Sequence, residues 1–151
     1  MKPSDTFFSG NRYAIFGAKA PGRAHGDVLI TALKKAGRKP IAIQDDPATV
    51  KGAEVCKTLS DAGQVDGVVI LPPAPWDDTS ARFTSDAVDQ CRAQGITGVW
   101  IYTAGDPSEA VKIAEGAGLD PVAGHCPCLY IIGSGFPHNV HQFIAKLMKQ
   151  Y

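Results

Sequence analysis

Residues 13–17 read Tyr-Ala-Ile-Phe-Gly, four apolar residues that end at a glycine, which is typical of a buried strand running into a tight turn. A loop rich in Gly, Pro and Lys follows. Apolar residues then recur at helical spacing between Val28 and Ala36, and Gly37 ends the expected helix. A strand joined to an amphipathic helix by a glycine loop is the first half of a strand–helix–strand unit, so this stretch predicts an α/β fold.

The same alternation of short apolar runs and longer helical patterns continues along the chain. We expect further strands at 40–43, 65–71, 98–102 and 121–123, and helices at 53–60, 78–94, 106–118 and 138–149. Residues Asp106, Pro107, Ser108 and Glu109 have the spacing of a helix capping box. Repeated units with short loops need right-handed crossovers, which predicts a doubly wound, mostly parallel sheet with helices on both faces.

The length and composition fit one small domain. With 151 residues, we expect an N-terminal lead-in at 1–11 and a single domain at 12–151. Fifteen Lys and Arg balance fifteen Asp and Glu, so no basic excess points to nucleic acid or an anionic membrane. No apolar run approaches the roughly 18 residues of a membrane span, and the first ten residues do not resemble a signal peptide. We therefore expect a cytoplasmic protein, and a homo-oligomer stays open.

The cysteines and histidines do not form a recognisable metal site. Cys126 and Cys128 form a C-P-C motif, while Cys56 and Cys91 stand alone, so the paired C-x-x-C arms of a zinc site are missing. The other closely spaced pair, His138 and His141, has no evident third ligand. We expect reduced thiols and no bound metal.

In open parallel sheets, ligands bind beyond the carboxyl ends of the strands, where the winding reverses. The segments that should lie at that edge are 17–26, 44–51, 72–76, 103–106 and 124–128. The first reads G-A-K-A-P-G-R-A-H-G, and the helix after it offers N–H groups and a positive dipole end to a phosphate. Lys19 and Arg23 could add charge to the same anion, and His25 could contact it. Lys19 stands where the strict G-x-G-x-x-G dinucleotide motif has its second glycine.

Several strings in one order resemble a known family. They are R-Y-A-I-F-G-A at 12–18, P-I-A-I-Q-D-D-P at 40–47, V-K-G-A-E-V-C-K-T-L-S-D at 50–61, V-D-G-V-V-I at 65–70, G-V-W-I at 98–101, A-G-L-D-P-V at 117–122 and H-C-P at 125–127. Together they resemble the CoA-binding domain family, Rossmann-like domains related to the CoA-binding domain of the succinyl-CoA synthetase α subunit. The similarity covers about residues 12–132. It implies a stand-alone, non-catalytic module that binds CoA or acyl-CoA by its nucleotide end.

The resemblance also implies which positions touch the ligand. Gly17, Ala18 and Lys19 would form the diphosphate loop, and Pro47 with its neighbours would lie by the adenosine ribose. The residues that would border the adenine or pantetheine path are Leu71, Pro72 and Pro73. Gly105 is also expected at the ligand, in the segment after the fourth strand, although this chain has Tyr-Thr-Ala-Gly at 102–105 where the family often has a Gln and then a Gly. Cys126 matches a cysteine that often follows the family's last strand.

Two features of the sequence keep other functions open. Asp45 and Asp46 precede Pro47, and an acid at this strand end is what NAD sites use for a ribose hydroxyl. The first alternative is therefore a small NAD-dependent oxidoreductase. The second is a thiol-redox or regulatory protein in which Cys126, beside His125, forms a mixed disulfide with the CoA thiol. No catalytic triad or pair of catalytic carboxylates is evident from the spacing.

Overall fold

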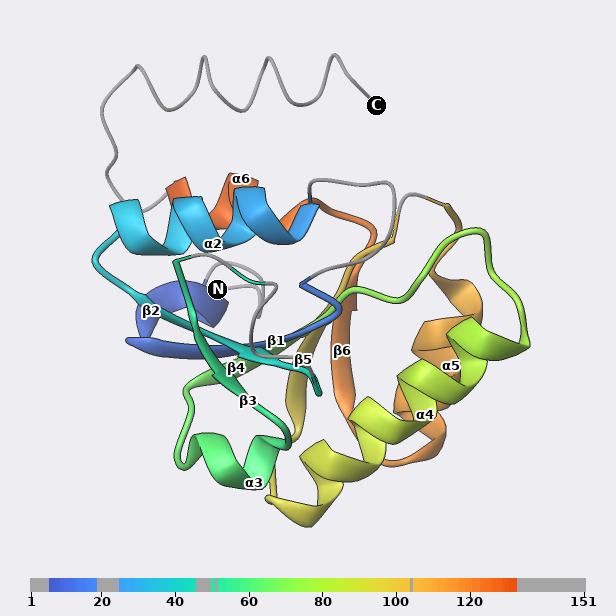
Figure 1. The fold of residues 1–151 in the computed structure, drawn as a ribbon. Coiled ribbons are helices and arrows are strands. Elements are labelled where there is room, and N and C mark those ends of the chain that lie inside the picture. Colours follow the sequence, from blue (N-terminus) through green and yellow to red (C-terminus); the bar gives the residue numbers. More distant parts are fainter. Residues whose placement is uncertain (1–5, 19–24, 46–49, 51, 104, 133–151) are drawn as a thin grey trace.

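The computed structural model describes residues 6–18, 25–45, 50, 52–103 and 105–132 (Figure 1). Its strands are β1 (Arg12–Phe16), β2 (Lys39–Ile43), β3 (Glu54–Cys56), β4 (Gly67–Ile70), β5 (Gly98–Ile101) and β6 (Asp120–Ala123). Its helices are the 3₁₀ turn η1 (Phe7–Ser9), α2 (His25–Lys35), α3 (Leu59–Ala62), α4 (Asp78–Ala93), α5 (Ser108–Gly116) and α6 (Pro127–Ile132). The predicted helix at 138–149 lies outside the described residues, so it and the predicted bounds of the domain stay predictions.

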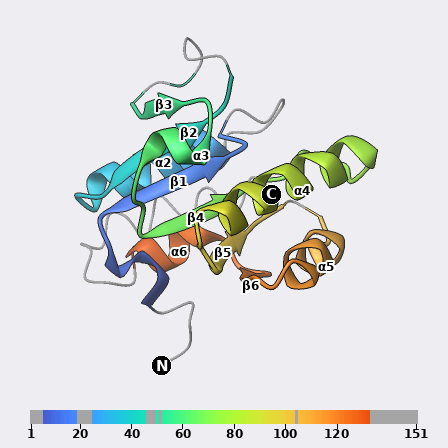
Figure 2. The same cartoon turned by 90° about the horizontal axis from the view of Figure 1, so that it is seen from below.

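The six strands form one parallel sheet in the order β3-β2-β1-β4-β5-β6, with β3 and β6 at its two edges (Figure 2). Phe16 at the end of β1 is in register with Ile43 of β2 on one side and Ile70 of β4 on the other. The chain builds outward from β1 to β3 and then returns to the far side of β1 to start β4. The winding therefore reverses between β1 and β4, which confirms the predicted doubly wound, Rossmann-like fold.

Helices cover both faces of the sheet, with α2 and α6 on one face and α3, α4 and α5 on the other (Figure 1). Alternate residues of each strand point to opposite faces, so Ile15 packs in the core under α2 while Phe16 packs in the core under α4. A sheet buried on both faces needs strands that are apolar throughout, which is why these runs were readable in the sequence. Trp100 in β5 has no exposed surface, and its indole Nε1 donates to the carbonyl oxygen of His125 at 3.0 Å.

The predicted helix at 53–60 is wrong for its first half. Residues Glu54–Cys56 form β3, which pairs with Ile41–Ile43 of β2, and the helix α3 starts only at Leu59. Pairing with an existing strand edge outweighs the weak helical pattern of this stretch. Thr58 then begins α3, because its hydroxyl oxygen accepts a hydrogen bond from the N–H of Asp61 at 3.2 Å.

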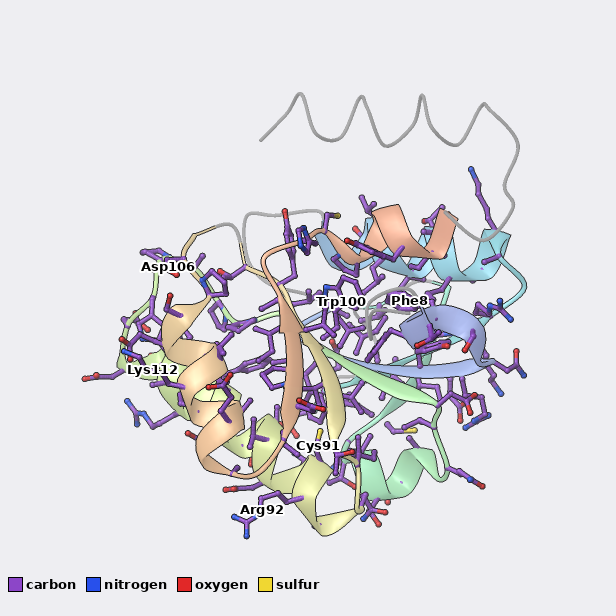
Figure 3. All side chains as sticks on the ribbon, turned by 180° about the vertical axis from the view of Figure 1, so that it is seen from behind. Phe8, Cys91, Arg92, Trp100, Asp106 and Lys112 are labelled. Carbon is purple, nitrogen blue, oxygen red and sulfur yellow. The ribbon has the colours of Figure 1, made fainter. Side chains whose placement is uncertain are left out.

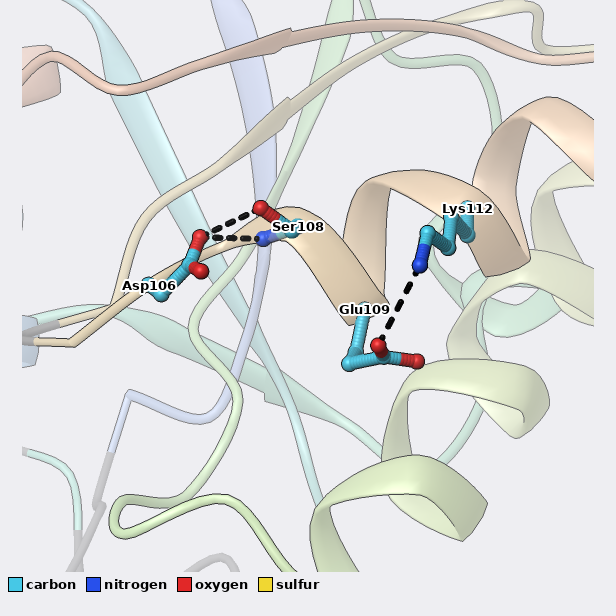
Figure 4. Close-up of polar contacts among 4 residues, drawn as sticks. All are labelled: Asp106, Ser108, Glu109 and Lys112. Carbon is cyan, nitrogen blue, oxygen red and sulfur yellow. Dashed lines mark hydrogen bonds and ion pairs between the residues drawn. The ribbon is translucent and has the colours of Figure 1, made fainter.

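The capping box lies on a different helix from the predicted one. Before α5, Asp106 accepts hydrogen bonds from the N–H and the hydroxyl of Ser108, while Glu109 pairs with Lys112 at 3.4 Å instead of reaching back (Figure 4). The predicted capping box at residues 106–109 is therefore wrong. At the start of α4, Asp77 accepts from the N–H of Ser80, and the Ser80 hydroxyl accepts from the N–H of Asp77.

The segment predicted as a lead-in contributes to the core. Phe8 in η1 is 4% exposed, with its ring 5.1 Å from that of Tyr13 and 5.4 Å from that of Trp100 (Figure 3). The Tyr13 hydroxyl donates to the carbonyl oxygen of Phe7 at 2.9 Å and accepts from the N–H of Gly10 at 2.7 Å. These contacts hold the segment against β1 and β5. In the described part of the chain, no helix has the length and apolarity needed to cross a bilayer.

Candidate functional site

A pocket of about 360 Å³ opens at the carboxyl edge of the sheet, beside the point where the winding reverses. Its lining comes from the ends of β1, β2 and β4, from the residue after β3 and from α4, and comprises Phe16, Gly17, Ile43, Gln44, Asp45, Lys57, Leu71, Pro73, Phe83, Asp86 and Gln90. This is the place where doubly wound sheets bind their ligands. Apolar walls with a few polar groups at the rim are typical of a small-molecule site.

Gly17 closes the floor of this pocket at the end of β1. Its φ is +88°, and a Cβ atom on it would lie 2.2 Å from the carbonyl oxygen of Leu71. The N–H of Leu71 donates to the carbonyl oxygen of Phe16 at 2.8 Å, which continues the ladder between β1 and β4 by one residue. The two strands, β1 and β4, therefore separate directly after this bond, at Gly17. Only glycine fits both the backbone conformation and the space at this position.

Gly26 has a matching role at the start of α2. A Cβ atom on it would lie 1.8 Å from the carbonyl oxygen of Ala18, which itself is 5% exposed. The first turn of the helix thus packs directly against the residue that follows Gly17. Close packing of helix on strand is the task of the last glycine in dinucleotide-binding loops. Our sequence interpretation did not single out Gly26, although it ends the G-x₈-G spacing of this loop.

Three charged side chains line the pocket, and all three are exposed: Asp45 after β2, Lys57 after β3 and Asp86 on α4. Gln90 fixes one of them, because its amide Nε2 donates to Oδ2 of Asp86 at 3.0 Å while its Oε1 accepts from the N–H of Leu59 at 2.9 Å. The bond from Leu59 also ties the start of α3 to α4. Among the described residues, neither Asp45 nor Lys57 is in a salt bridge.

The comparison with protein families identifies the chain. A family model described as CoA binding domain matches residues 11–131, which is most of the 151 residues and includes every strand of the sheet. The chain belongs to the CoA-binding domain family. None of the curated proteins compared with it is a significant match.

Solved structures share the fold of this CoA-binding domain. A conserved hypothetical protein from Pyrococcus furiosus has a TM-score of 0.63 at 16% identity, covering 80% of this chain and 98% of its own. Prb, a protein redesigned for binding, has a TM-score of 0.64 at 20% identity, covering 89% and 93%. A protein from Thermus thermophilus has a TM-score of 0.61 at 23% identity, covering 86% and 96%. At these identities the likeness establishes the architecture.

The predicted ligand residues of this CoA-binding domain divide into four groups. Those that line the pocket are Gly17, Asp45, Leu71 and Pro73, and those buried directly beside it in sequence are Ala18 and Pro72. Gly105, after β5, and Cys126, after β6, do not line the pocket and follow the other strands of the same edge. The remaining predictions, Lys19, Arg23, Asp46, Pro47 and the side chain of His25, lie outside the described residues. His25 itself opens α2.

The pocket residues that sequence reasoning did not name as ligand residues include Phe83, Asp86 and Gln90 of α4, together with Lys57; Phe16, Ile43 and Gln44 at the strand ends were not named either. The helix of the first three was predicted, but its amphipathic pattern does not say which strand ends its polar side approaches. Lys57 was assigned to a helix and instead follows β3. The N–H of Gln44 donates to the carbonyl oxygen of Cys56 at 2.9 Å, and this bond brings Lys57 alongside the end of β2.

The C-P-C motif of the CoA-binding domain is a packed corner where β6 leads into α6. Cys128 is 4% exposed, and a hydrogen bond with Cys126 together with burial raises the pKa of its thiol well above the ordinary value. Cys126 is half-buried, and none of the four cysteines of the chain is in a disulfide. A raised pKa keeps Cys128 protonated at neutral pH, so it lacks the thiolate that redox chemistry requires.

A second pocket of about 530 Å³ lies at the opposite, amino-terminal edge of the sheet. Its one charged lining residue is Asp66, whose Oδ2 accepts from the N–H of Asn11 at 2.7 Å and of Arg12 at 2.9 Å. These bonds lower the pKa of Asp66 below the ordinary value. The Asp66 carboxylate thus holds the start of β1. Within the part of the chain that the structure describes, no other charged side chain that could bind a ligand lines this pocket.

Proposed function

We propose that this protein is a module that binds CoA or an acyl-CoA by its nucleotide end. One observation supports this above all. The pocket at the switch point, with Gly17 as its floor, lies inside the region that matches the CoA-binding family. A cytoplasmic location and a homo-oligomeric state stay predictions.

The shape of the carboxyl edge suggests how the ligand would lie. The adenosine would enter the pocket, where Ile43, Leu71 and Phe83 offer apolar surface to the base. The diphosphate would lie over Gly17 and near the amino end of α2, which has 11 residues and brings its dipole close to the loop. The pantetheine arm would then run along the edge toward β5 and β6, where Gly105 and Cys126 follow their strands.

The residues outside the described part have assigned roles in this proposal. Lys19 and Arg23 would add positive charge beside the diphosphate, and His25 at the first position of α2 would contact it. Asp46 and Pro47 would stand next to Asp45 by the ribose. Because a cation beside a phosphate makes a charge-assisted hydrogen bond, reversing its charge should weaken every phosphorylated ligand.

Isothermal titration calorimetry with CoA, acetyl-CoA and dephospho-CoA tests the proposal. We expect saturable binding of at least one of the three and a loss of at least tenfold in affinity in Lys19→Glu. The matched control is Arg92→Glu, the same kind of charge reversal in the last turn of α4, at a residue that does not line the pocket. No saturable heat with any ligand would remove the proposed function, and unchanged affinity in Lys19→Glu would place the phosphate elsewhere.

One observation favours a second candidate, a small NAD-dependent oxidoreductase. Asp45 lines the pocket at the end of β2, the position from which an acid holds the adenosine ribose in NAD enzymes. This candidate predicts that NADH fluorescence rises on binding and that Asp45→Ala abolishes the rise. An NADH signal without any response to CoA would favour it over the CoA-binding module.

A further inference from the structure

The charges around the pocket are unequal. Two carboxylates, Asp45 and Asp86, face one ammonium group, Lys57, so the side chains that line the pocket carry a net charge of −1. The hydrogen bond that Asp86 accepts comes from the neutral amide of Gln90, which orients the carboxylate without cancelling its charge. An additional anion entering this pocket therefore meets more negative than positive charge.

Asp45 stands where a ribose would meet it. It lies two residues beyond β2, which pairs with β1, the strand that ends just before Gly17, and Gln44 before it extends the pairing of β2 with β3. A carboxylate only accepts hydrogen bonds, and the 2′- and 3′-hydroxyls of a ribose can both donate to it. A 3′-phosphate at neutral pH offers mainly acceptor oxygens and negative charge. The same carboxylate therefore attracts the diol and repels the phosphate.

Lys57 offsets this repulsion only in part. It follows β3, pairs with none of the described acids in a salt bridge, and is the one cation among the pocket-lining residues. A phosphate bearing nearly two negative charges would still be repelled by both carboxylates. A neutral ribose adds no charge, so the attraction between Lys57 and Asp45 would be unchanged. The discrimination thus depends on three named side chains at the rim.

We propose that the pocket selects an adenosine diphosphate group whose ribose 2′- and 3′-hydroxyls are both free, over the 3′-phosphorylated ribose of CoA itself. The inference rests on the proposed function, because it places the adenosine of the ligand in this pocket. Dephospho-CoA and a nicotinamide dinucleotide share the chemistry. The titrations below separate these two sources by their relative affinities.

Calorimetric titrations of CoA, dephospho-CoA and NADH into the wild type, Asp45→Asn and Asp89→Asn test this selectivity. In the wild type we expect dephospho-CoA to bind about tenfold more tightly than CoA. In Asp45→Asn we expect weaker dephospho-CoA binding, stronger CoA binding and little remaining difference. Asp89→Asn is the control, because Asp89 is exposed on the same helix as Asp86 but does not line the pocket, and it should match the wild type.

A second measurement does not depend on any variant. Raising the ionic strength screens repulsion between exposed charges. Between about 0.05 M and 0.5 M salt the screening length falls below the dimensions of the pocket, so the advantage of dephospho-CoA over CoA should shrink over this range. A merely structural role for Asp45 would weaken CoA and dephospho-CoA alike in the variant and leave the salt dependence of their ratio unchanged.

The outcomes separate this inference from the proposed function. CoA binding as tightly as dephospho-CoA in the wild type, or a preference for dephospho-CoA in Asp45→Asn as large as in the wild type, overturns the selectivity while the CoA-binding module stands. No binding of CoA or dephospho-CoA overturns the proposed function. Dephospho-CoA and NADH both have an adenosine ribose with free 2′- and 3′-hydroxyls. If both bind, the one that binds more tightly identifies which kind of ligand the pocket takes, and either result supports the selectivity.

Discussion

Replacing Gly17 by alanine tests whether the separation of β1 from β4 sets the floor of the pocket. The alanine would meet two penalties, a left-handed backbone at φ +88° and a Cβ atom only 2.2 Å from the carbonyl oxygen of Leu71. The chain provides a matched control in Gly37, which has φ +73° and no atom within 4 Å of the position of a Cβ. The two substitutions share the conformational penalty, and only the first has the steric one.

The magnitudes follow from these two contributions. A left-handed conformation costs an L-residue about 1–2 kcal/mol, and the lower entropy of the unfolded chain returns part of it in both variants. Gly37→Ala should therefore lose about 1 kcal/mol. Overpacking a closely packed site costs about 1–3 kcal/mol more. With a urea m-value of about 2 kcal/mol/M, Gly17→Ala should unfold about 0.5–1.5 M earlier than Gly37→Ala.

Urea unfolding followed by tryptophan fluorescence measures both midpoints, with Trp100 in β5 as a buried probe. In parallel, titration with CoA and dephospho-CoA should show that Gly17→Ala loses binding while Gly37→Ala keeps it, since Gly37 follows α2 at the end opposite the pocket. Equal midpoints for the two variants would refute the steric account. Wild-type affinity in Gly17→Ala would show that this turn does not shape the ligand site.

Three further predictions concern stability and reactivity. Phe8→Ala removes a buried ring between Tyr13 and Trp100 and should cost about 3–5 kcal/mol by thermal unfolding, whereas a loss below about 1 kcal/mol would mean that η1 is not part of the core. Because Asp66 has a lowered pKa in the folded protein, its contribution to stability is fully present above the ordinary aspartate pKa of about 3.9. That contribution disappears as the pH falls through the pKa that Asp66 has in the folded protein. Asp66→Asn should therefore flatten the acid side of the stability profile, and an unchanged profile would contradict this. Burial raises the pKa of Cys91 to about 12, so iodoacetamide at pH 8 should leave it unmodified in the native protein, as peptide mass mapping can check.

The central strands could be predicted from the sequence because each leaves a strong local signal. The runs that became β1 and β4 are buried on both faces, so almost every residue in them is apolar. The strand β3 leaves no such signal, because it has three residues, lies at the sheet edge and includes the exposed Glu54. Only its pairing with β2 makes it a strand, and such pairing is not visible in a local pattern.

The candidate site could be predicted in part for the same reason. Strand ends are readable, so Gly17, Asp45 and Leu71 could be placed at one edge before the structure was known. The wall formed by α4 could not, because helical periodicity gives the buried face of a helix but not its distance from a particular loop. The close approach of Gly26 to Ala18 likewise depends on the packing angle of α2, which the sequence does not encode locally.

Membership of the CoA-binding family and the choice of ligand depend on different parts of the molecule. The family match covers residues 11–131, which include every strand of the sheet and the closely packed glycines Gly17 and Gly26. The rim charges of Asp45, Lys57 and Asp86 are exposed, so the fold would tolerate their replacement at little cost. Under the proposed selectivity, replacing these side chains would change which form of the adenosine binds without disturbing the architecture. A titration with CoA alone would then test only the proposed function, and the ratio of dephospho-CoA to CoA affinity would test the proposed role of these three side chains.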